Sequence, residues 1–140
     1  MTVAVYIPSE GVIAYDSRLT QGTLIVSDDI EKLLDFGDIK LIAACDMGDE
    51  RRIAESFIDE SAHYNEDFQS FVVDRDNDVY LFERGEKSNK SMRLDFPCAI
   101  GAGAPFATVG IKLGMTAVQC VELAIQNNTE CGGRIRTISL

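Results

Sequence analysis

Positive charge is scarce in this sequence. Its 140 residues include 13 lysines and arginines against 23 aspartates and glutamates, so the formal net charge at neutral pH is -10. Nucleic acids and anionic membranes attract proteins through a cationic face. The composition therefore argues against both as partners. At this length we expect one domain that spans residues 1–140.

Paired cysteines and long apolar runs are also lacking. The four cysteines are Cys45, Cys98, Cys120 and Cys131. They form no CxxC pair, so neither a zinc knuckle nor a disulfide scaffold is predicted, and a reducing cytoplasmic environment is expected. The apolar segment at residues 1–7 has no basic flank and stops at Pro8, so we expect neither a signal peptide nor a membrane span.

Cofactor and metal motifs are missing too. The Gly101–Gly103 stretch lacks the third glycine of a dinucleotide-binding loop, which would fall at Phe106, so a packed turn between strand and helix is favoured. His63 is the only histidine and lies on a predicted helix, so no histidine-based triad can be located. The acidic clusters lack calcium-loop spacing and are interpreted as solvated turns. We expect no cofactor and no metal.

The first third of the chain predicts strands. Apolar runs at Val3–Ile7 and Val12–Tyr15 flank a Pro-Ser-Glu-Gly turn and predict a β-hairpin. A third strand is expected at Thr23–Val26. Two more are expected at residues 33–36 and 41–45, on either side of a glycine turn.

The rest of the chain mixes helices and strands. Apolar residues at three-to-four-residue spacing predict an amphipathic helix from Asp49 to about Tyr64. Two helices are expected after Gly103, the second opened by a capping box of Thr116 and Gln119. Further strands are predicted at residues 70–73, 79–83, 91–94, 98–100 and 135–140. Segregated hairpins and helices favour an α+β architecture over a parallel α/β sheet.

One predicted strand runs directly into charged residues. The stretch GVIAYDSRLTQG carries an apolar run straight into Asp16-Ser17-Arg18. Charges at the end of a buried strand need partners. Lys32 lies sixteen positions after Asp16. Taken alone, these two residues predict no more than an ion pair at the rim of a sheet.

Five stretches of the chain are similar to segments of one known family. They are MTVAV, GVIAYDSRLTQG, DIEKLLDF, AIGAGAPFA and CGGRIRTISL, and they cover most of the chain outside its middle. Together they resemble the proteasome β-subunit and bacterial HslV family of N-terminal nucleophile hydrolases. The resemblance implies a four-layer αββα sandwich that self-associates into a homo-oligomeric ring. It also implies a peptide substrate and a partner unfoldase.

The resemblance gives Asp16 and Lys32 a catalytic meaning. Thr2 matches the nucleophile, provided that Met1 is removed so that the free α-amine can act as the base for the threonine hydroxyl. Protonated Lys32 would favour the neutral amine and stabilise the developing alkoxide. Asp16 would keep the lysine charged and oriented.

Weaker matches complete the implied site. Met47 and Gly48 lie in the segment AACDMGDE, where the resemblance implies a backbone amide that binds the oxyanion. Ala102 stands where the family has a serine between two glycines. Asn128 stands where it has an aspartate, and Cys131 replaces the serine of the late turn.

Two registers are open at the start of the chain. If Thr2 is the nucleophile, the hairpin before Asp16 is two residues shorter than in the family, a cut that keeps each side chain on its face. If Val3-Ala4-Val5 is matched to the family's similar triplet, no nucleophile exists. The hypotheses are therefore a threonine-type peptidase and a catalytically silent assembly subunit, with a hydrolase of small amides as a third.

Overall fold

The computed structural model describes residues 2–140, which form two compact units. The first unit comprises the chain through Lys32 together with Asp95–Leu140, and the second comprises Leu33–Leu94. Met1, whose removal the peptidase hypothesis requires, lies outside the described residues. Within residues 2–140, no helix has both the length and the apolar character that crossing a membrane requires.

The first unit is built on a four-stranded antiparallel sheet. Its strands follow the order β10 (Cys98–Gly101), β1 (Val3–Ile7), β2 (Val12–Tyr15) and β11 (Arg136–Ser139). The predicted hairpin is confirmed, since β1 pairs with β2 and Val5 lies opposite Ala14. Strand β1 is paired on both edges and buried along its whole length.

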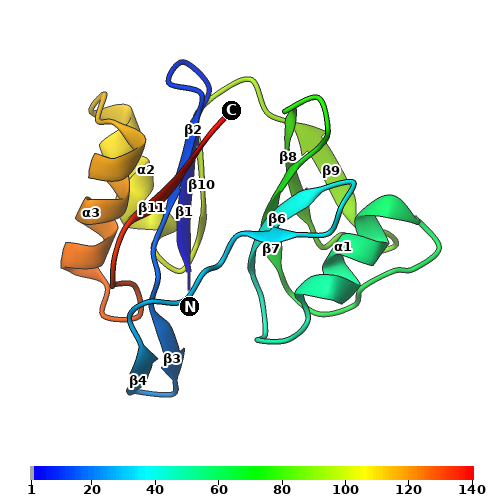
Figure 1. Ribbon diagram of the computed structural model, residues 1–140, viewed down its shortest axis with the longest axis horizontal. Helices are drawn as coiled ribbons and strands as arrows, with labels where there is room; N and C mark the ends of the chain where they lie inside the picture. The colour runs from blue at the N-terminus through cyan, green and yellow to red at the C-terminus, as the bar shows by residue number, and fades with distance from the viewer. Residues whose placement is uncertain (1) are drawn as a thin grey trace. The chain divides into compact units, whose positions relative to one another are not determined.

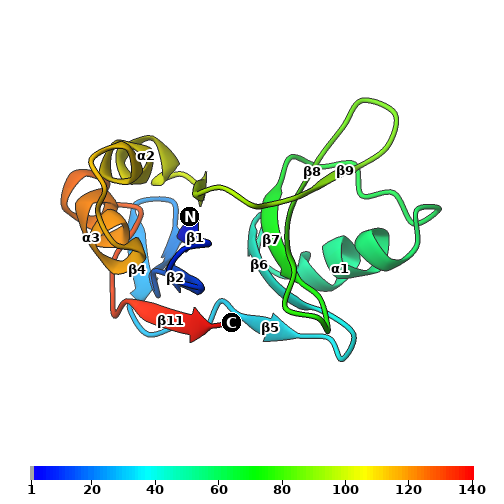
Figure 2. The ribbon, with the colours of Figure 1, turned by 90° about the horizontal axis from the view of Figure 1, so that it is seen from above.

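Two helices cover one face of this sheet (Figures 1 and 2). They are α2 (Ala104–Lys112) and α3 (Ala117–Asn127). The predicted capping box of α3 is confirmed: Gln119 N donates to Thr116 Oγ1 (3.2 Å), and Thr116 N donates to Gln119 Oε1 (3.0 Å). The core between helices and sheet is made by buried small and β-branched residues of both layers, among them Val3, Val5, Ala107, Val121 and Ala124.

A short hairpin extends from one end of this unit (Figure 1). It consists of β3 (Leu19–Gln21) and β4 (Leu24–Ser27), joined through Gly22 in the left-handed conformation (φ +61°). The strand predicted at Thr23–Val26 is confirmed as β4 with a shift of one residue. Strand β3 was missed because a three-residue strand with one large apolar side chain carries no detectable periodicity.

The second unit is a five-stranded antiparallel sheet with one helix on it. The strand order is β5 (Leu34–Asp35), β6 (Lys40–Ala44), β7 (Gln69–Val73), β8 (Val79–Glu83) and β9 (Lys90–Arg93). Helix α1 (Glu50–Ile58) packs on it through Ile53 and Ala54, and the rings of Phe57 and Phe82 meet edge to face at 5.1 Å between centroids. The strands expected in this region are all present.

Helix α1 is shorter than the sequence predicts. It ends at Ile58 rather than near Tyr64, because Asp59 is extended and its carboxylate accepts hydrogen bonds from the amide and the hydroxyl of Ser61. Such local bonding competes with helix continuation. His63 therefore lies beyond the helix and not on it, which corrects the sequence-based placement. Tyr64 is buried in the core of the second unit, where its ring packs on Phe68, and its hydroxyl donates to Asp49 (2.7 Å).

Removing the cap of α3 will destabilise the protein. We expect Thr116→Ala to lower the free energy of unfolding by about 1 kcal/mol, because the amide of Gln119 loses its acceptor. Urea denaturation followed by circular dichroism measures this change. Thr129→Ala, at an exposed turn position, is the control and should change stability by less than about 0.5 kcal/mol. Equal effects of the two substitutions would contradict the role of the capping box.

Candidate active site

Three side chains from separate segments of the first unit meet at one point. Lys32 Nζ donates to Asp16 Oδ1 at 2.7 Å and to Thr2 Oγ1 at 3.3 Å. Thr2 lies just before β1, Asp16 just after β2, and Lys32 in the segment that follows β4. Thr2 therefore faces Lys32, the arrangement that a nucleophile at Thr2 would require.

The Asp16 carboxylate is fully buried, and both of its oxygens have partners. In addition to Lys32, Oδ1 accepts from the amide of Val3 (3.2 Å), and Oδ2 accepts from the amide of Gly132 (3.1 Å). A buried carboxylate is tolerated only when an opposite charge and hydrogen bonds replace its hydration. The charges that follow the apolar run of β2 are thus explained, since Asp16 joins the start of the chain to the turn before β11.

The ammonium group of Lys32 lies where it can stabilise a negative charge on Thr2. Its side chain is only 10% exposed, so the charge is poorly screened by water. It lies within hydrogen-bonding distance of the Thr2 hydroxyl, where it would stabilise negative charge that develops on that oxygen. The geometry therefore suits a threonine oxygen that is activated in place.

The end of β10 and the turn that follows it pack against the backbone of Thr2. Gly101 has φ +90°, and a Cβ at this position would overlap the carbonyl oxygen of Thr2. Gly103 N donates to that same oxygen at 3.4 Å, and a Cβ on Gly103 would press against the side chain of Val3. The packed strand-to-helix turn expected from the sequence is confirmed.

Ala102 and Asn128 join two turns of this unit. The Asn128 amide donates from Nδ2 to the carbonyl of Ala102 (3.1 Å) and accepts at Oδ1 from the amide of Glu130 (2.9 Å). Asn128 therefore ties the turn before α2 to the turn that leads to β11. Ala102 takes part through its backbone and carries no hydroxyl.

Cys131 is fully buried beside the Asp16–Lys32 pair. Burial, together with the negative charge of Asp16, raises the pKa of its thiol from 9.0 to about 11, and Lys32 opposes part of this rise. The thiol is consequently protonated at neutral pH. It fills the position as a small apolar group and not as a thiolate nucleophile.

Met47 and Gly48 belong to the second unit. Gly48 has φ +95°, and its amide donates to the carboxylate of Glu50 (Oε2, 3.0 Å), which begins α1. Met47 is strongly exposed. Of the two residues whose backbone amides the sequence suggested for an oxyanion, Gly48 thus has its amide bonded to a carboxylate within its own unit.

Several residues around the site were missed by sequence reasoning. Gly132 supplies an amide to Asp16, and Ser17 donates through Oγ to the carbonyl of Arg134 (2.6 Å). Tyr15 donates through its hydroxyl to Glu31 (2.7 Å). Tyr15 and Glu31 are sixteen residues apart, as are Asp16 and Lys32, and this repeated separation is the signal that could have found them.

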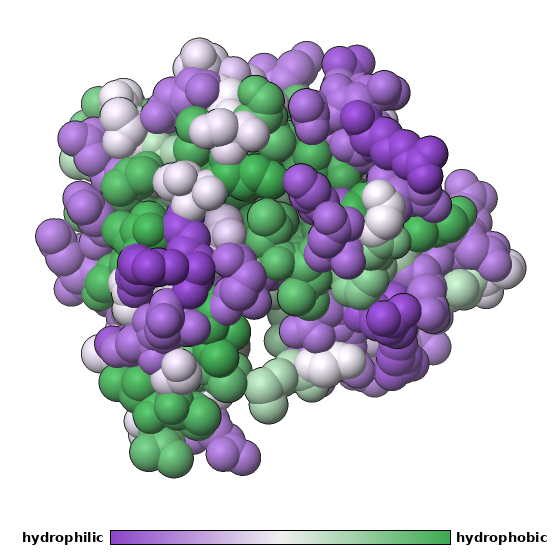
Figure 3. Space-filling model, viewed as in Figure 1, coloured by the Kyte–Doolittle hydropathy of each residue, from purple (hydrophilic) through white to green (hydrophobic). Residues whose placement is uncertain are grey.

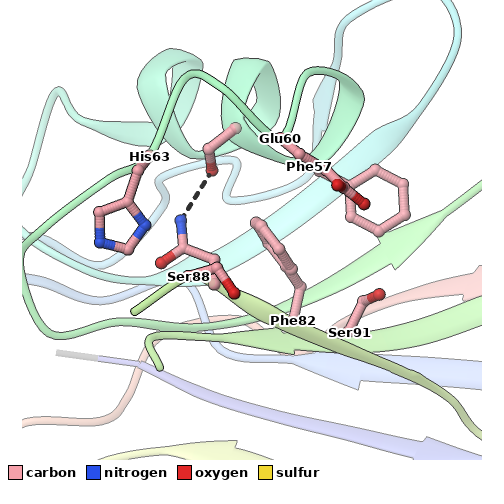
Figure 4. Close-up of a pocket in the computed structure, with 8 residues that line it drawn as sticks. Phe57, Glu60, His63, Phe82, Ser88 and Ser91 are labelled. Carbon is pink, nitrogen blue, oxygen red and sulfur yellow. Dashed lines mark hydrogen bonds between the residues drawn. The ribbon is translucent and has the colours of Figure 1, made fainter. Parts of the chain in front are cut away.

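A small pocket lies in the second unit (Figure 4). Its volume is about 140 Å³, and its lining includes Glu60, His63 and Ser88. The side-chain amide of Asn89 is 3.3 Å from the hydroxyl of Ser56 at the same place. None of the residues predicted for the catalytic site lines this pocket.

Comparisons with known proteins give a likeness of fold. No protein-family model matches this chain, and no curated protein matches it. A solved chain of BPH from Thiobacillus denitrificans, in complex with epoxomicin, superposes with a TM-score of 0.72 at 16% identity. The match covers 99% of this chain and 97% of that chain.

The likeness identifies the class of fold. BPH is a bacterial proteasome-like protein, and this chain shares its fold. The α+β class predicted from the sequence is confirmed: two helices pack on the antiparallel sheet of the first unit, and one helix packs on that of the second. At 16% identity the likeness shows a shared fold and carries no information on activity.

Because Gly101 lies so close to Thr2, we expect any side chain at position 101 to lower the free energy of unfolding strongly. We expect Gly101→Ala to destabilise the protein by roughly 1 to 3 kcal/mol more than Gly37→Ala. Both glycines have φ +90°, but nothing lies within 4 Å of a Cβ at Gly37, so the difference isolates the clash with Thr2. Chemical denaturation of the two variants tests this, and equal losses would contradict the close packing.

The raised pKa of Cys131 predicts a loss of stability in alkali. The folded state keeps the thiol protonated, so its contribution is complete below about pH 9 and disappears as pH rises toward 11. Between these values wild type should lose about 2 kcal/mol more stability than Cys131→Ala. Denaturation curves across this range measure the difference. Parallel pH dependences in the two proteins would show that the thiol ionises normally.

Proposed function

We propose that this chain is a proteasome-like subunit that cleaves peptide bonds with Thr2 as its nucleophile. The observation that carries the proposal is the position of Lys32 Nζ, which is 2.7 Å from Asp16 Oδ1 and 3.3 Å from Thr2 Oγ1. A purely structural ion pair between Asp16 and Lys32 would not need a hydroxyl beside the ammonium group. Here the Thr2 hydroxyl lies at that place.

The reaction needs a free α-amine on Thr2. While Met1 is attached, the Thr2 nitrogen is an amide and cannot accept a proton, so Met1 must first be removed. The freed amine takes the proton of the Thr2 hydroxyl as Oγ1 attacks the peptide carbonyl carbon. The same amine then protonates the departing peptide nitrogen as the carbon–nitrogen bond breaks, leaving an ester on Thr2.

Water completes the cycle. The α-amine accepts a proton from water, whose oxygen attacks the ester carbonyl, and the carbon–oxygen bond to Thr2 breaks. The proton returns to Oγ1, and the peptide acid leaves. Lys32 stabilises negative charge on Oγ1 during both attacks, and Asp16 keeps the lysine charged and oriented throughout the cycle.

Self-association into a homo-oligomeric ring is part of the proposal. Three adjacent residues of β4 expose apolar side chains, Leu24 at 63%, Ile25 at 47% and Val26 at 52%. Figure 3 shows apolar surface over the projecting β3–β4 hairpin. Apolar surface of this kind supports a protein contact. We further propose that both units form one domain, that the protein works in the cytoplasm, and that a partner unfoldase supplies peptide substrate.

A catalytically silent assembly subunit is the second candidate. Two observations favour it: Ala102 provides no hydroxyl for proton transfer, and the Gly48 amide is bonded to Glu50. In that case Asp16 and Lys32 would serve only to hold the strand ends together. Thr2→Ala would then leave every function of the protein unchanged.

Labelling with a threonine-directed electrophile separates the two candidates. We expect wild-type protein to lose Met1 and to gain the mass of one epoxomicin, because Thr2 then has both a free amine and an activated hydroxyl. Thr2→Ala should gain no mass, and its peptide hydrolysis should fall at least about a thousandfold. Intact-protein mass spectrometry and a fluorogenic peptide assay give these readings.

Thr137→Ala is the matched control for this test. It removes an exposed threonine hydroxyl from β11 and should be labelled as wild type is. Wild-type protein that has lost Met1 but stays unmodified and inactive would refute the peptidase. Retained Met1 without labelling would support the silent subunit.

A further inference from the structure

The segment that carries Lys32 has no regular secondary structure. It runs from the end of β4 at Ser27 to the start of β5 at Leu34. Strand pairing therefore does not fix the position of the lysine. A backbone bond from Ile30 N to the carbonyl of Ser17 (2.9 Å) attaches the segment to the residues after β2, and Arg134 N donates to the carbonyl of Asp28 (3.4 Å).

Side chains supply further attachment. Arg18 Nε donates to Asp28 Oδ1 (2.7 Å), which holds the beginning of the segment. Arg136 on β11 reaches both Asp29 (2.7 Å) and Glu31 (3.3 Å) with its guanidinium. Because residues two apart share one partner, Asp29 and Glu31 lie on the same side of an extended stretch.

The Tyr15–Glu31 hydrogen bond sets the register of this stretch against β2. Successive side chains of extended chain point to opposite faces, so Tyr15 and Asp16 point apart, and so do Glu31 and Lys32. Tyr15 meets Glu31 on one face at 2.7 Å, and Asp16 meets Lys32 on the other face at 2.7 Å. The first contact fixes which residue lies opposite Asp16.

The Tyr15 hydroxyl is well suited to this task. Its ring is buried on β2, so the hydroxyl is held in place by the sheet core. Arg136 lies directly opposite Tyr15 on the neighbouring strand and approaches the same Glu31 carboxylate. Tyr15 and Arg136 thus hold the carboxylate between them, while Glu31 and Asp29 are largely at the surface.

We propose that Tyr15, acting through Glu31, is a positioning residue that holds the Lys32 ammonium on Asp16 and beside the Thr2 hydroxyl. The inference rests on the proposed function for its catalytic consequence, but the placement of Lys32 can be measured without catalysis. Tyr15 itself touches neither Thr2 nor Lys32 in the contacts that define the site.

Site-specific acylation of lysines tests the placement. Wild type and Tyr15→Phe are treated with acetic anhydride, and the modification of Lys32 is followed by peptide mass spectrometry. Loss of the hydrogen bond from Tyr15 to the Glu31 carboxylate should raise the acylation rate of Lys32 roughly tenfold. Lys112, exposed at the end of α2, is the internal reference and should react equally in both proteins.

Tyr80→Phe is the matched control variant. It removes a tyrosine hydroxyl that donates to a carboxylate, Asp74 Oδ2 at 3.3 Å, in the second unit. Its acylation rate at Lys32 should equal that of wild type, because the lost bond lies in the second unit. Glu31→Ala breaks the Tyr15–Glu31 hydrogen bond from its exposed end. In the double variant Tyr15→Phe/Glu31→Ala, Lys32 should be acylated no faster than in Glu31→Ala alone.

Epoxomicin labelling then tests the catalytic consequence. A displaced ammonium should slow the covalent step about tenfold to a hundredfold in Tyr15→Phe, with the concentration for half-maximal rate unchanged. Equal rates of Lys32 acylation in wild type and Tyr15→Phe would overturn the inference. It would also be overturned if Tyr15→Phe were acylated faster at Lys32 but reacted with epoxomicin at the wild-type rate. Wild type that is never labelled, together with the acylation difference, would refute the proposed peptidase and leave the positioning of Lys32 established.

Discussion

The buried carboxylate of Asp16 is the interaction on which the rest of the site depends. It accepts hydrogen bonds from Val3, Lys32 and Gly132, three residues that are far apart in the chain. A carboxylate without water is costly unless such partners surround it. The start of β1, the segment after β4 and the turn before β11 are therefore held at one place by the need to solvate a single charge.

Steric limits act alongside this charge. The left-handed turn at Gly101 brings backbone against the Thr2 carbonyl, and Gly103 packs on Val3, so Thr2 has little freedom where it meets Lys32. Cys131 fills space beside the pair as a neutral thiol, and Asn128 links the two neighbouring turns. Positions that differ from the family pattern thus support the site by packing and hydrogen bonding, and Ala102 leaves it without a further hydroxyl.

Much of the fold follows from local patterns in the sequence. Alternating or continuous apolar runs predicted the β1–β2 and β7–β8 hairpins, and the Thr116–Gln119 pair marked the start of α3 correctly. Local patterns failed where other forces decide. Asp59 ends α1 through its bonds to Ser61, although the apolar spacing that predicted the helix continues to Ala62, and β3 is too short to have a period.

The α+β class, the order of the strands and helices other than β3, and the sixteen-residue separation of Asp16 and Lys32 follow from the sequence alone, because these depend on periodicity, capping and spacing. The contact of Thr2 with Lys32, and the grip of Tyr15 and Arg136 on Glu31 next to that lysine, are visible only in the folded chain. The same holds for the bond between the Gly48 amide and Glu50. The physical reason is that hydrogen bonds between distant segments depend on strand register and burial, which no local pattern encodes.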